Sequence, residues 1–301
     1  MRHHSRRLCR YHARLADIDA PRDGIGYGHP STRMDRLPVR AAVGLTGAAA
    51  ISLAARQVRA LSSSGALAAT VVGGSVVAGA EMRGGGMLLA FFTSSTLLGR
   101  LPAGDHVEQR RGRERDAVQV IANGGVAAIL ALGSLLPWER TRPLFTAGFG
   151  GALATATADT WATEIGSRSR ARPRSILTRQ PTAPGASGGV TADGLVASAV
   201  AAALIAGMAS AQVASTSRRS SPRAIAIALG GFTGALFDSV LGATVQEVRF
   251  CDSCFVETEA QIHRCGTHTR VLRGVPWCDN DMVNAIATAA GATTAILIQL
   301  P

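Results

Sequence analysis

Carboxylate and carboxamide side chains interrupt several long apolar stretches of this chain. Asp159 and Glu164 lie in the stretch TATADTWATEIG, and Asp238 lies in GGFTGALFDSVLGATVQ. Gln119 and Asn123 stand at the edge of another apolar run. An ionisable side chain inside a bilayer-spanning segment is costly and by default marks a functional site. These residues are therefore the first candidates for chemistry.

The polar residues recur at intervals of four, which places each set on one face of a helix. The sets are Gln119 with Asn123, Asp159 with Thr163, Asp238 with Gly242 and Gln246, and Asn280 with Asn284. Glu164 is five residues past Asp159, so we expect it to point elsewhere and to cap the helix or meet the following loop.

Several carboxylates and carboxamides beside arginines suit a magnesium ion that holds a polyphosphate. Magnesium prefers a few carboxylates together with phosphate oxygens and water, and arginine binds phosphate through two parallel hydrogen bonds. Phosphoryl transfer needs little beyond such positioning and charge. The candidate arginines are Arg110, Arg111, Arg113 and Arg115 in one loop and those from Arg168 to Arg179 in another. The alternative is that these arginines only anchor the loops at anionic headgroups.

A glycine-rich loop, TAPGASGGVTADG, lies between two of the apolar runs. Its Gly185, Gly188 and Gly189 would let backbone amides approach a phosphate. A flexible connector is the equally weighted alternative.

The segment 249–279 differs in kind, because it gathers cysteine and histidine. Cys251 and Cys254 form one C-x-x-C pair, and His263, Cys265 and His268 follow. Three cysteines and one histidine would complete a tetrahedral zinc site. The spacing leaves open whether His263 or His268 is the fourth ligand. Because all four ligands come from the protein, we expect a structural role for this zinc.

Composition indicates an integral membrane protein. Of the residues, 47% are hydrophobic and only 17% are charged, below the roughly 25% of ordinary soluble domains. The 34 glycines fit closely packed membrane helices. The net charge of +11 does not indicate nucleic-acid binding, because the arginines stand in short blocks between apolar runs. No lysine is present, which excludes a G-x-x-x-x-G-K-[ST] phosphate loop.

We predict an all-α, polytopic bundle of seven or eight transmembrane helices over residues 38–301, with the zinc-ribbon-like loop 249–279 inserted before the last helix. Residues 1–37 are predicted to be a basic disordered tail or a misassigned start, with Met34 as the initiator. The apolar runs span residues 39–55, 64–82, 86–101, 117–137, 144–165, 190–214, 224–247 and 282–300. Most approach the roughly 20 residues that cross a bilayer.

Alternation of eight spans puts every polar set at the same side of the membrane. The loops on that side, 56–63, 102–116, 166–189 and 248–281, hold most of the arginine between spans. The positive-inside rule places this side in the cytoplasm, although the arginine-rich tail would then lie outside. We therefore expect the cell membrane, with the active face cytoplasmic.

The strings RERDAVQVIANGG, GALATATADTWATEIG, PGASGGVTADG, GGFTGALFDSVLGATVQ and NDMVN occur in this order. In this order they resemble the transmembrane protein 19 family, which includes plant phytyl-phosphate kinases. The resemblance covers about residues 40–300. It implies a kinase that converts an isoprenoid monophosphate into the diphosphate with a nucleoside triphosphate donor.

The residues and the resemblance together suggest a set of roles. Asp159 and Asp238 would hold magnesium, with Glu164 and Asp281 as secondary ligands. Asn123, Gln246, Asn280 and Asn284 would orient phosphates and metal-bound water. Substrate contacts are predicted for Arg111, Arg115, Gln119, Arg168, Arg179, Gly185, Gly188 and Gly189. The alternative function is a transporter or ion-coupled carrier, in which the same carboxylates would line a pathway. The oligomeric state and the length of the prenyl chain do not follow from the sequence.

Overall fold

The computed structural model describes residues 36–101, 114–211 and 220–300. Seven helices and five short strands make up this part of the chain. Of the predicted tail, residues 1–37, residues 1–35 lie outside it, and Leu37 already belongs to the first described helix. In chain order the elements are α2 (Leu37–Gln57), α3 (Ser63–Arg100), α4 (Ala117–Gly133), α5 (Arg142–Gly166), β1 (Arg174–Ser175), β2 (Gly189–Val190), α6 (Ala192–Ala211), α7 (Ser220–Thr244), β3 (Val248–Cys251), β4 (Val256–Thr258), β5 (Arg270–Arg273) and α8 (Asn280–Gln299).

Helix α3 is a hairpin rather than one straight rod. A straight helix of its length would extend about 57 Å. Instead, Nη2 of Arg100 at its end donates to the carbonyl of Val58, just before its start, at 2.6 Å. The chain reverses at Glu81, whose φ of 62° is outside the helical range. The two arms of α3 therefore correspond to the predicted runs 64–82 and 86–101.

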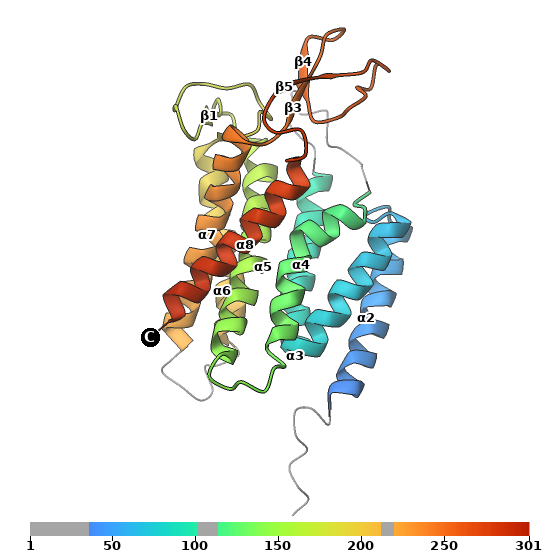
Figure 1. The fold of residues 1–301 in the computed structure, drawn as a ribbon, viewed down its shortest axis with the longest axis vertical. Coiled ribbons are helices and arrows are strands. Elements are labelled where there is room, and N and C mark those ends of the chain that lie inside the picture. The colour runs from blue at the N-terminus through green and yellow to red at the C-terminus, as the bar shows by residue number, and fades with distance from the viewer. Residues whose placement is uncertain (1–35, 102–113, 212–219, 301) are drawn as a thin grey trace, which may run out of the picture. The chain divides into compact units, whose positions relative to one another are not determined.

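The helices alternate in direction (Figure 1), so half of their ends meet at what we call the sheet end. Backbone contacts between loops identify this end: Ala60 and Ser62 bond Arg115, and Glu247 bonds Cys278. The sheet end contains the starts of α3, α4, α6 and α8 and the ends of α2, α3, α5 and α7. This arrangement matches the alternation expected from the sequence.

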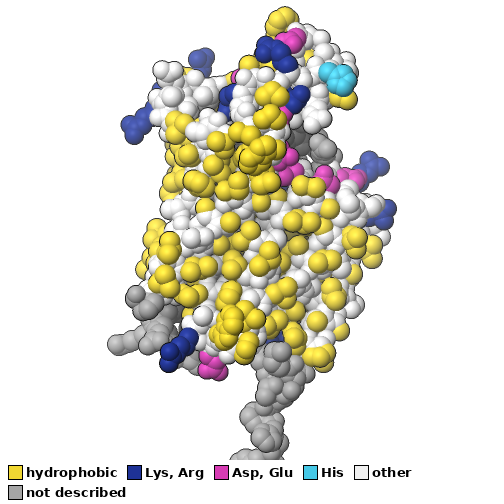
Figure 2. Space-filling view, in the orientation of Figure 1, with side chains coloured by type: hydrophobic (Ala, Val, Ile, Leu, Met, Phe, Trp, Pro, Cys, Tyr) yellow, Lys and Arg dark blue, Asp and Glu magenta, His cyan; other side chains and the backbone are white. Residues whose placement is uncertain are grey.

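Five helices are long and apolar enough to cross a membrane by length and composition, namely α2, α3, α6, α7 and α8. Large apolar side chains on them are exposed, with Leu67 70% and Val196 64% accessible. Figure 2 shows an apolar body whose charged side chains gather at its two ends in that view. Exposed apolar surface of this extent is expected against lipid rather than water.

Helix α5 is different because its neighbours enclose it. Every residue from Ala147 to Ala158 is buried, and α5 packs against α3, α4, α6, α7 and α8. An enclosed helix does not need an apolar surface for lipid, which explains how α5 accommodates Thr155 and Thr157. The rest of the polar string, from Asp159 to Glu164, lies beyond this buried stretch, near the end of the helix.

Glycine allows α5, α7 and α8 to approach closely around Thr155. Oγ1 of Thr155 donates to the carbonyl of Gly151 at 2.9 Å. A Cβ atom placed on Gly291 of α8 would lie 1.9 Å from this oxygen, and one placed on Gly234 of α7 would lie 2.3 Å from it. Small residues at such crossings are typical of membrane helix packing.

Two helices end three or four residues before the ends of the predicted apolar runs. Helix α4 ends at Gly133, four residues before the end of the predicted run at Pro137, since the segment that follows it forms turns. Helix α7 ends at Thr244, and the chain then enters β3, so the predicted run to 247 is too long.

We predict that Gly291→Ala destabilises the bundle, because the added methyl group meets Thr155 and the backbone oxygen of Gly230, 2.7 Å away. Overpacking of a close-packed core costs about 1–3 kcal/mol. Gly207→Ala is the matched control, since nothing among the described residues lies within 4 Å of a Cβ at that position. Thermal unfolding in detergent should show a lower midpoint for Gly291→Ala only; equal midpoints would contradict this packing.

Candidate functional site

Asp159, Asp238 and Asn284 lie near the same level of three helices that touch one another. Helices α5 and α7 run in the same direction, as the contacts of Gly150 with Ile227 and of Gly231 with Ala154 show. Thr155 of α5 contacts Gly234 of α7. Asp159 lies one turn beyond Thr155, and Asp238 lies one turn beyond Gly234.

On α8, which runs in the opposite direction, two turns from Gly291 lead back to Asn284. Residues separated by four or seven positions share a helical face. Asp159, Asp238 and Asn284 therefore lie on the faces through which α5, α7 and α8 pack. They are one or two turns from the Thr155 contact, on the side of the sheet end. All three are partly buried.

The polar residues of α4 lie beside α8. Oγ1 of Thr288 reaches the carbonyl of Ala122 at 3.4 Å, which brings the two helices together near Asn123. The Nδ2 atom of Asn123 donates to the carbonyl of Gln119 at 3.0 Å, so part of its hydrogen-bonding capacity is used within α4. Asn280 and Asp281 occupy the first turn of α8, after the N-cap Asp279.

Glu164 lies between two arginines at the border of α3 and α5. Its carboxylate pairs with Nη1 of Arg168 at 3.0 Å. Burial lowers the pKa of Arg115, and the charge of Glu164 partly offsets this shift. The guanidinium of Arg115 sits over the ring of Phe92, 5.8 Å from its centroid. Arg115 and Glu164 are thus neighbours, in line with the expectation that Glu164 meets a loop.

Arg168 ties α5 to the end of α3. Its Nη2 atom donates to the carbonyls of Leu98 and Leu101 at 2.8 and 2.7 Å. Leu98 lies in the last turn of α3, and Leu101 is the C-cap residue that follows it. This arrangement gives Arg168 a structural task, and its predicted contact with substrate stays a prediction. Arg111 lies outside the described residues.

Gln246 lies beyond the end of α7, so it does not continue the helical face of Asp238. It is 3% exposed, and its Nε2 atom donates to Oε1 of Glu259 at 3.0 Å. The four-residue spacing from Asp238 through Gly242 to Gln246 suggested one continuous helical face. That interpretation is wrong for Gln246, because the helix ends at Thr244.

The glycine-rich loop packs against the end of α7. Gly188 has a φ of +80°, and a Cβ atom there would lie 2.4 Å from Cβ of Ala243. The amide of Gly189 donates to the carbonyl of Ala186 at 3.0 Å. Close packing is thus one reason for these glycines. Gly185 (φ +80°) and Arg179 are exposed on the same loop, and phosphate binding by this loop stays a prediction.

Arg273 of β5 joins three parts of the sheet end. Its Nη1 atom donates to the carbonyl of Gly242 in α7 at 3.0 Å, and its Nη2 atom donates to the carbonyl of Ser187 in the glycine-rich loop at 3.2 Å. Sequence reasoning missed this residue. A single arginine in a loop carries no spacing signal, and its partners are distant backbone carbonyls.

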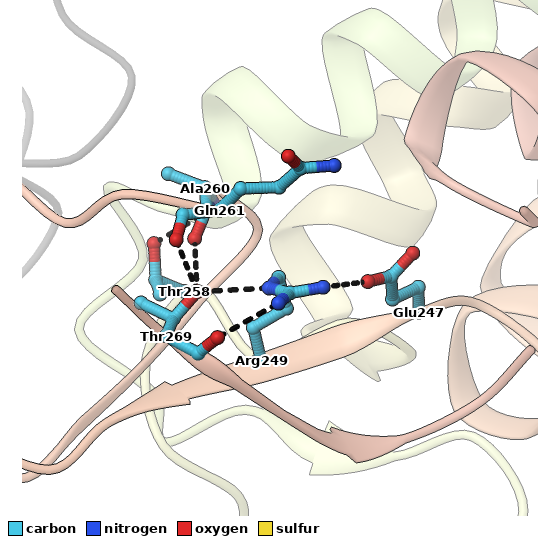
Figure 3. Close-up of polar contacts among 6 residues, drawn as sticks. All are labelled: Glu247, Arg249, Thr258, Ala260, Gln261 and Thr269. Carbon is cyan, nitrogen blue, oxygen red and sulfur yellow. Dashed lines mark hydrogen bonds and ion pairs between the residues drawn. The ribbon is translucent and has the colours of Figure 1, made fainter. Parts of the chain in front are cut away.

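A polar network holds the three-stranded sheet, whose order is β4-β3-β5. Arg249 pairs with Glu247 and donates from Nε to Oγ1 of Thr269 at 2.8 Å (Figure 3). The Thr269 hydroxyl in turn donates to the carbonyls of Ala260 and Gln261 at 2.7 and 2.9 Å. This network connects the strand β3 to the loop that carries the histidines.

Cys251, Cys254, His263 and Cys265 form a cluster that could bind a metal such as zinc. Their four ligand atoms all lie within 4.8 Å of one another. The Sγ atoms of Cys251 and Cys265 are 3.6 Å apart, and Nδ1 of His263 is 3.2 Å from Sγ of Cys265. Ligand atoms around a tetrahedral zinc are separated by about 3.8 Å, given a zinc–sulfur distance of about 2.3 Å. The predicted Cys₃His set is therefore present.

The fourth ligand in this cluster is His263 rather than His268. The chain folds back between them, with the amide of His263 bonded to the carbonyl of Thr267 at 2.9 Å. His268 pairs through its backbone with Ile262 and does not join the cluster.

The thiols of the cluster differ in their tendency to ionise. Hydrogen bonding with Thr267, and then with His263, lowers the pKa of Cys265 to about 5. The pKa of Cys254 is raised to about 11, mainly through its hydrogen bond with Cys265. A thiolate is the form that ligates metal, so Cys265 is prepared for this role at neutral pH. Burial raises the pKa of Cys278, which lies outside the cluster.

Comparison with known proteins identifies the class of this membrane bundle. Residues 46–292 match the family described as integral membrane protein DUF92. The chain therefore belongs to the DUF92 family of integral membrane proteins, which is the group that the sequence resemblance indicated. No solved structure matches the chain.

A plant relative shares most of this length. Protein PGR of Arabidopsis thaliana is 34% identical over 230 residues, which cover 69% of this chain and 78% of that protein. The match with the family model supports embedding in a membrane.

We predict that His263→Ala abolishes stoichiometric metal binding, whereas His268→Ala retains it, because only His263 lies in the cluster. The measurement is the metal content of purified protein by inductively coupled plasma mass spectrometry. Loss of metal in both variants, or in His268→Ala alone, would refute the assignment of the fourth ligand.

Proposed function

We propose that this protein is a membrane kinase that phosphorylates an isoprenoid monophosphate, of phytyl or related prenyl type, to the diphosphate. A nucleoside triphosphate serves as the donor. The observation that carries the proposal is the placement of Asp159 and Asp238 beside Asn284 on three packed helices. Two carboxylates with a carboxamide at a membrane face suit a cation that holds phosphate oxygens.

The depth of these residues favours an interfacial enzyme over a transport pathway. Asp159, Asp238 and Asn284 lie four to seven residues from the ends of their helices, which is about 6–11 Å along the axis. The midplane of a hydrocarbon core lies about 15 Å from its edge. Transporters place their sites near the midplane, whereas a lipid phosphate lies at the surface.

In the proposed reaction, Asp159 and Asp238 would hold magnesium, and Asn284 would orient a phosphate or a water bound to the metal. Magnesium supplies neutralisation of the charge on the donor phosphates. A nonbridging oxygen of the lipid monophosphate attacks the terminal phosphorus of the donor. The bond from that phosphorus to the bridging oxygen breaks, and the nucleoside diphosphate leaves.

Arginine at the sheet end would supply further positive charge. The loop from 168 to 179 carries Arg170, Arg172, Arg174 and Arg179 as exposed residues. The monophosphate of the substrate has a second pKa near 6, so it is largely ionised at neutral pH and needs no general base. We place the sheet end in the cytoplasm, where nucleoside triphosphates are available, in line with its arginine content.

We further propose that zinc occupies the Cys₃His cluster. Four protein ligands leave no open position, which is typical of structural zinc. The metal would fix the hairpin β3–β4 and, through β3, the strand β5 that carries Arg273. No step of the reaction requires it.

The test is transfer of radiolabelled terminal phosphate from CTP or ATP to a panel of prenyl monophosphates by purified protein in detergent with magnesium. We expect diphosphate formation to fall at least about a hundredfold in Asp159→Asn and in Asp238→Asn, since removal of a group that stabilises transition-state charge typically costs that much.

Asp193→Asn is the matched control, because Asp193 is exposed at the same end, where it accepts from Ser169 Oγ at 2.6 Å. It should retain activity. Folded protein that transfers phosphate to none of the lipids would refute the proposal, and liposome flux assays would then test transport.

A further inference from the structure

A polar cleft of about 340 Å³ opens at the sheet end, next to the proposed site but distinct from it. The glycine-rich loop, the end of α7 and the three-stranded sheet form its walls. The side chains that line it include Ser175, Thr182, Ser187, Ala243, Glu257 and Arg273. Its volume is within the range of small-molecule sites, about 300–1,000 Å³.

We propose that this cleft binds the nucleoside triphosphate donor. The inference rests on the proposed kinase function and extends it. It gives the polar substrate, the nucleotide, a binding site outside the membrane-spanning helices. A lipid monophosphate enters from the bilayer, whereas a nucleotide arrives from water and needs a site outside the apolar body.

The lining of the cleft suits a polar ligand and not a prenyl chain. Three hydroxyl groups, one carboxylate and one guanidinium line it, and its apolar members are alanines. Apolar chains are held by large apolar side chains, which this lining lacks. A nucleoside triphosphate presents ribose hydroxyls, base edges and phosphate oxygens, which match hydroxyl, carboxylate and guanidinium groups.

Two lining residues retain hydrogen-bonding capacity. The buried Oγ1 atom of Thr182 has no hydrogen-bond partner among the described residues. Buried polar atoms are normally paired, so rotation of the Thr182 side chain towards a ligand hydroxyl or phosphate in the cleft would give this oxygen a partner. Arg273 uses one N–H donor for Gly242 and one for Ser187, while a guanidinium has five.

Position and charge connect the cleft to the carboxylates. Gly242, whose carbonyl accepts from the lining residue Arg273, lies four residues beyond Asp238 on the same face of α7, about 6 Å along the helix axis. A nucleoside in the cleft could therefore direct its phosphates towards Asp238. The exposed Arg174 and Arg179 stand on the loop that forms one wall, and their charge favours an anionic ligand.

The test is a titration of purified protein in detergent with the fluorescent analogue trinitrophenyl-ATP, displaced by unlabelled ATP or CTP. Ala183→Phe fills the cleft, and Thr182→Val removes the buried hydroxyl while keeping the side-chain shape. Ala171→Phe is the matched control, because Ala171 is exposed on the same loop and does not line the cleft. Size-exclusion chromatography and thermal unfolding verify that each variant is folded.

We expect affinity to fall at least about tenfold in Ala183→Phe and about threefold to tenfold in Thr182→Val, which corresponds to the loss of one hydrogen bond. The control should stay within twofold of the wild type. Unchanged affinity in Ala183→Phe, or no nucleotide binding by folded wild type, would overturn the inference.

The two proposals fail in different ways. Nucleotide bound in the cleft without transfer to any prenyl phosphate would refute the kinase and retain the cleft. Phosphate transfer with unaltered nucleotide affinity in both variants would refute the cleft and retain the kinase.

Discussion

The close approach of α5, α7 and α8 around Thr155 is the constraint on which the rest of the bundle depends. Gly234 and Gly291 leave room for the threonine hydroxyl, and Gly230 of α7 would place a Cβ only 2.5 Å from the carbonyl of Gly291. No larger side chain fits at these positions without moving a helix. This contact fixes the positions of the three helices along one another. The relative positions of residues one or two turns away are therefore fixed as well. Asp159, Asp238 and Asn284 acquire a common level through this contact.

Enclosure of α5 resolves a difficulty that its polar sequence raises. A carboxylate that faces lipid would be expensive. The neighbours of α5 bury it over Ala147–Ala158, and Asp159 and Glu164, nearer the helix end, are partly buried. The outer helices α2, α3, α6, α7 and α8 supply the apolar surface for the membrane. The bundle thus separates two tasks between different helices: contact with lipid on the outside and polar chemistry on the inside.

The sheet end adds an aqueous layer to this membrane body. The small sheet is attached by backbone bonds from Glu247 to Cys278 and from Val275 to Val245, and by Arg273, which reaches α7 and the glycine-rich loop. Gly274 has a φ of +85°, and a Cβ there would lie 2.0 Å from the carbonyl oxygen of Gln246. A sheet this small buries little apolar surface, and a structural metal is a common way to stabilise such a unit. The proposed lipid substrate and the proposed nucleotide would then meet where the membrane body and this layer join.

The sequence alone determined the membrane class, the alternation of helices, the shared side of the polar sets and the composition of the Cys₃His cluster. These features depend on quantities that can be read along the chain. They are the length of each apolar run, the cost of a charge within it, and the rule that successive membrane spans alternate in direction. Even the reversal in α3 lies near the boundary between two predicted runs, although the strained conformation of Glu81 was not foreseen.

Only the tertiary structure decided which distant groups meet. It places His263, and not His268, in the Cys₃His cluster. It ends α7 before Gln246, whose side chain contacts Glu259. It also shows that Arg168 binds the end of α3 and that Arg273 binds α7 and the glycine-rich loop. Each of these outcomes depends on distances between segments far apart in the chain. Periodicity reports the face on which a side chain lies, but it carries no information on the backbone carbonyl that another segment brings to it.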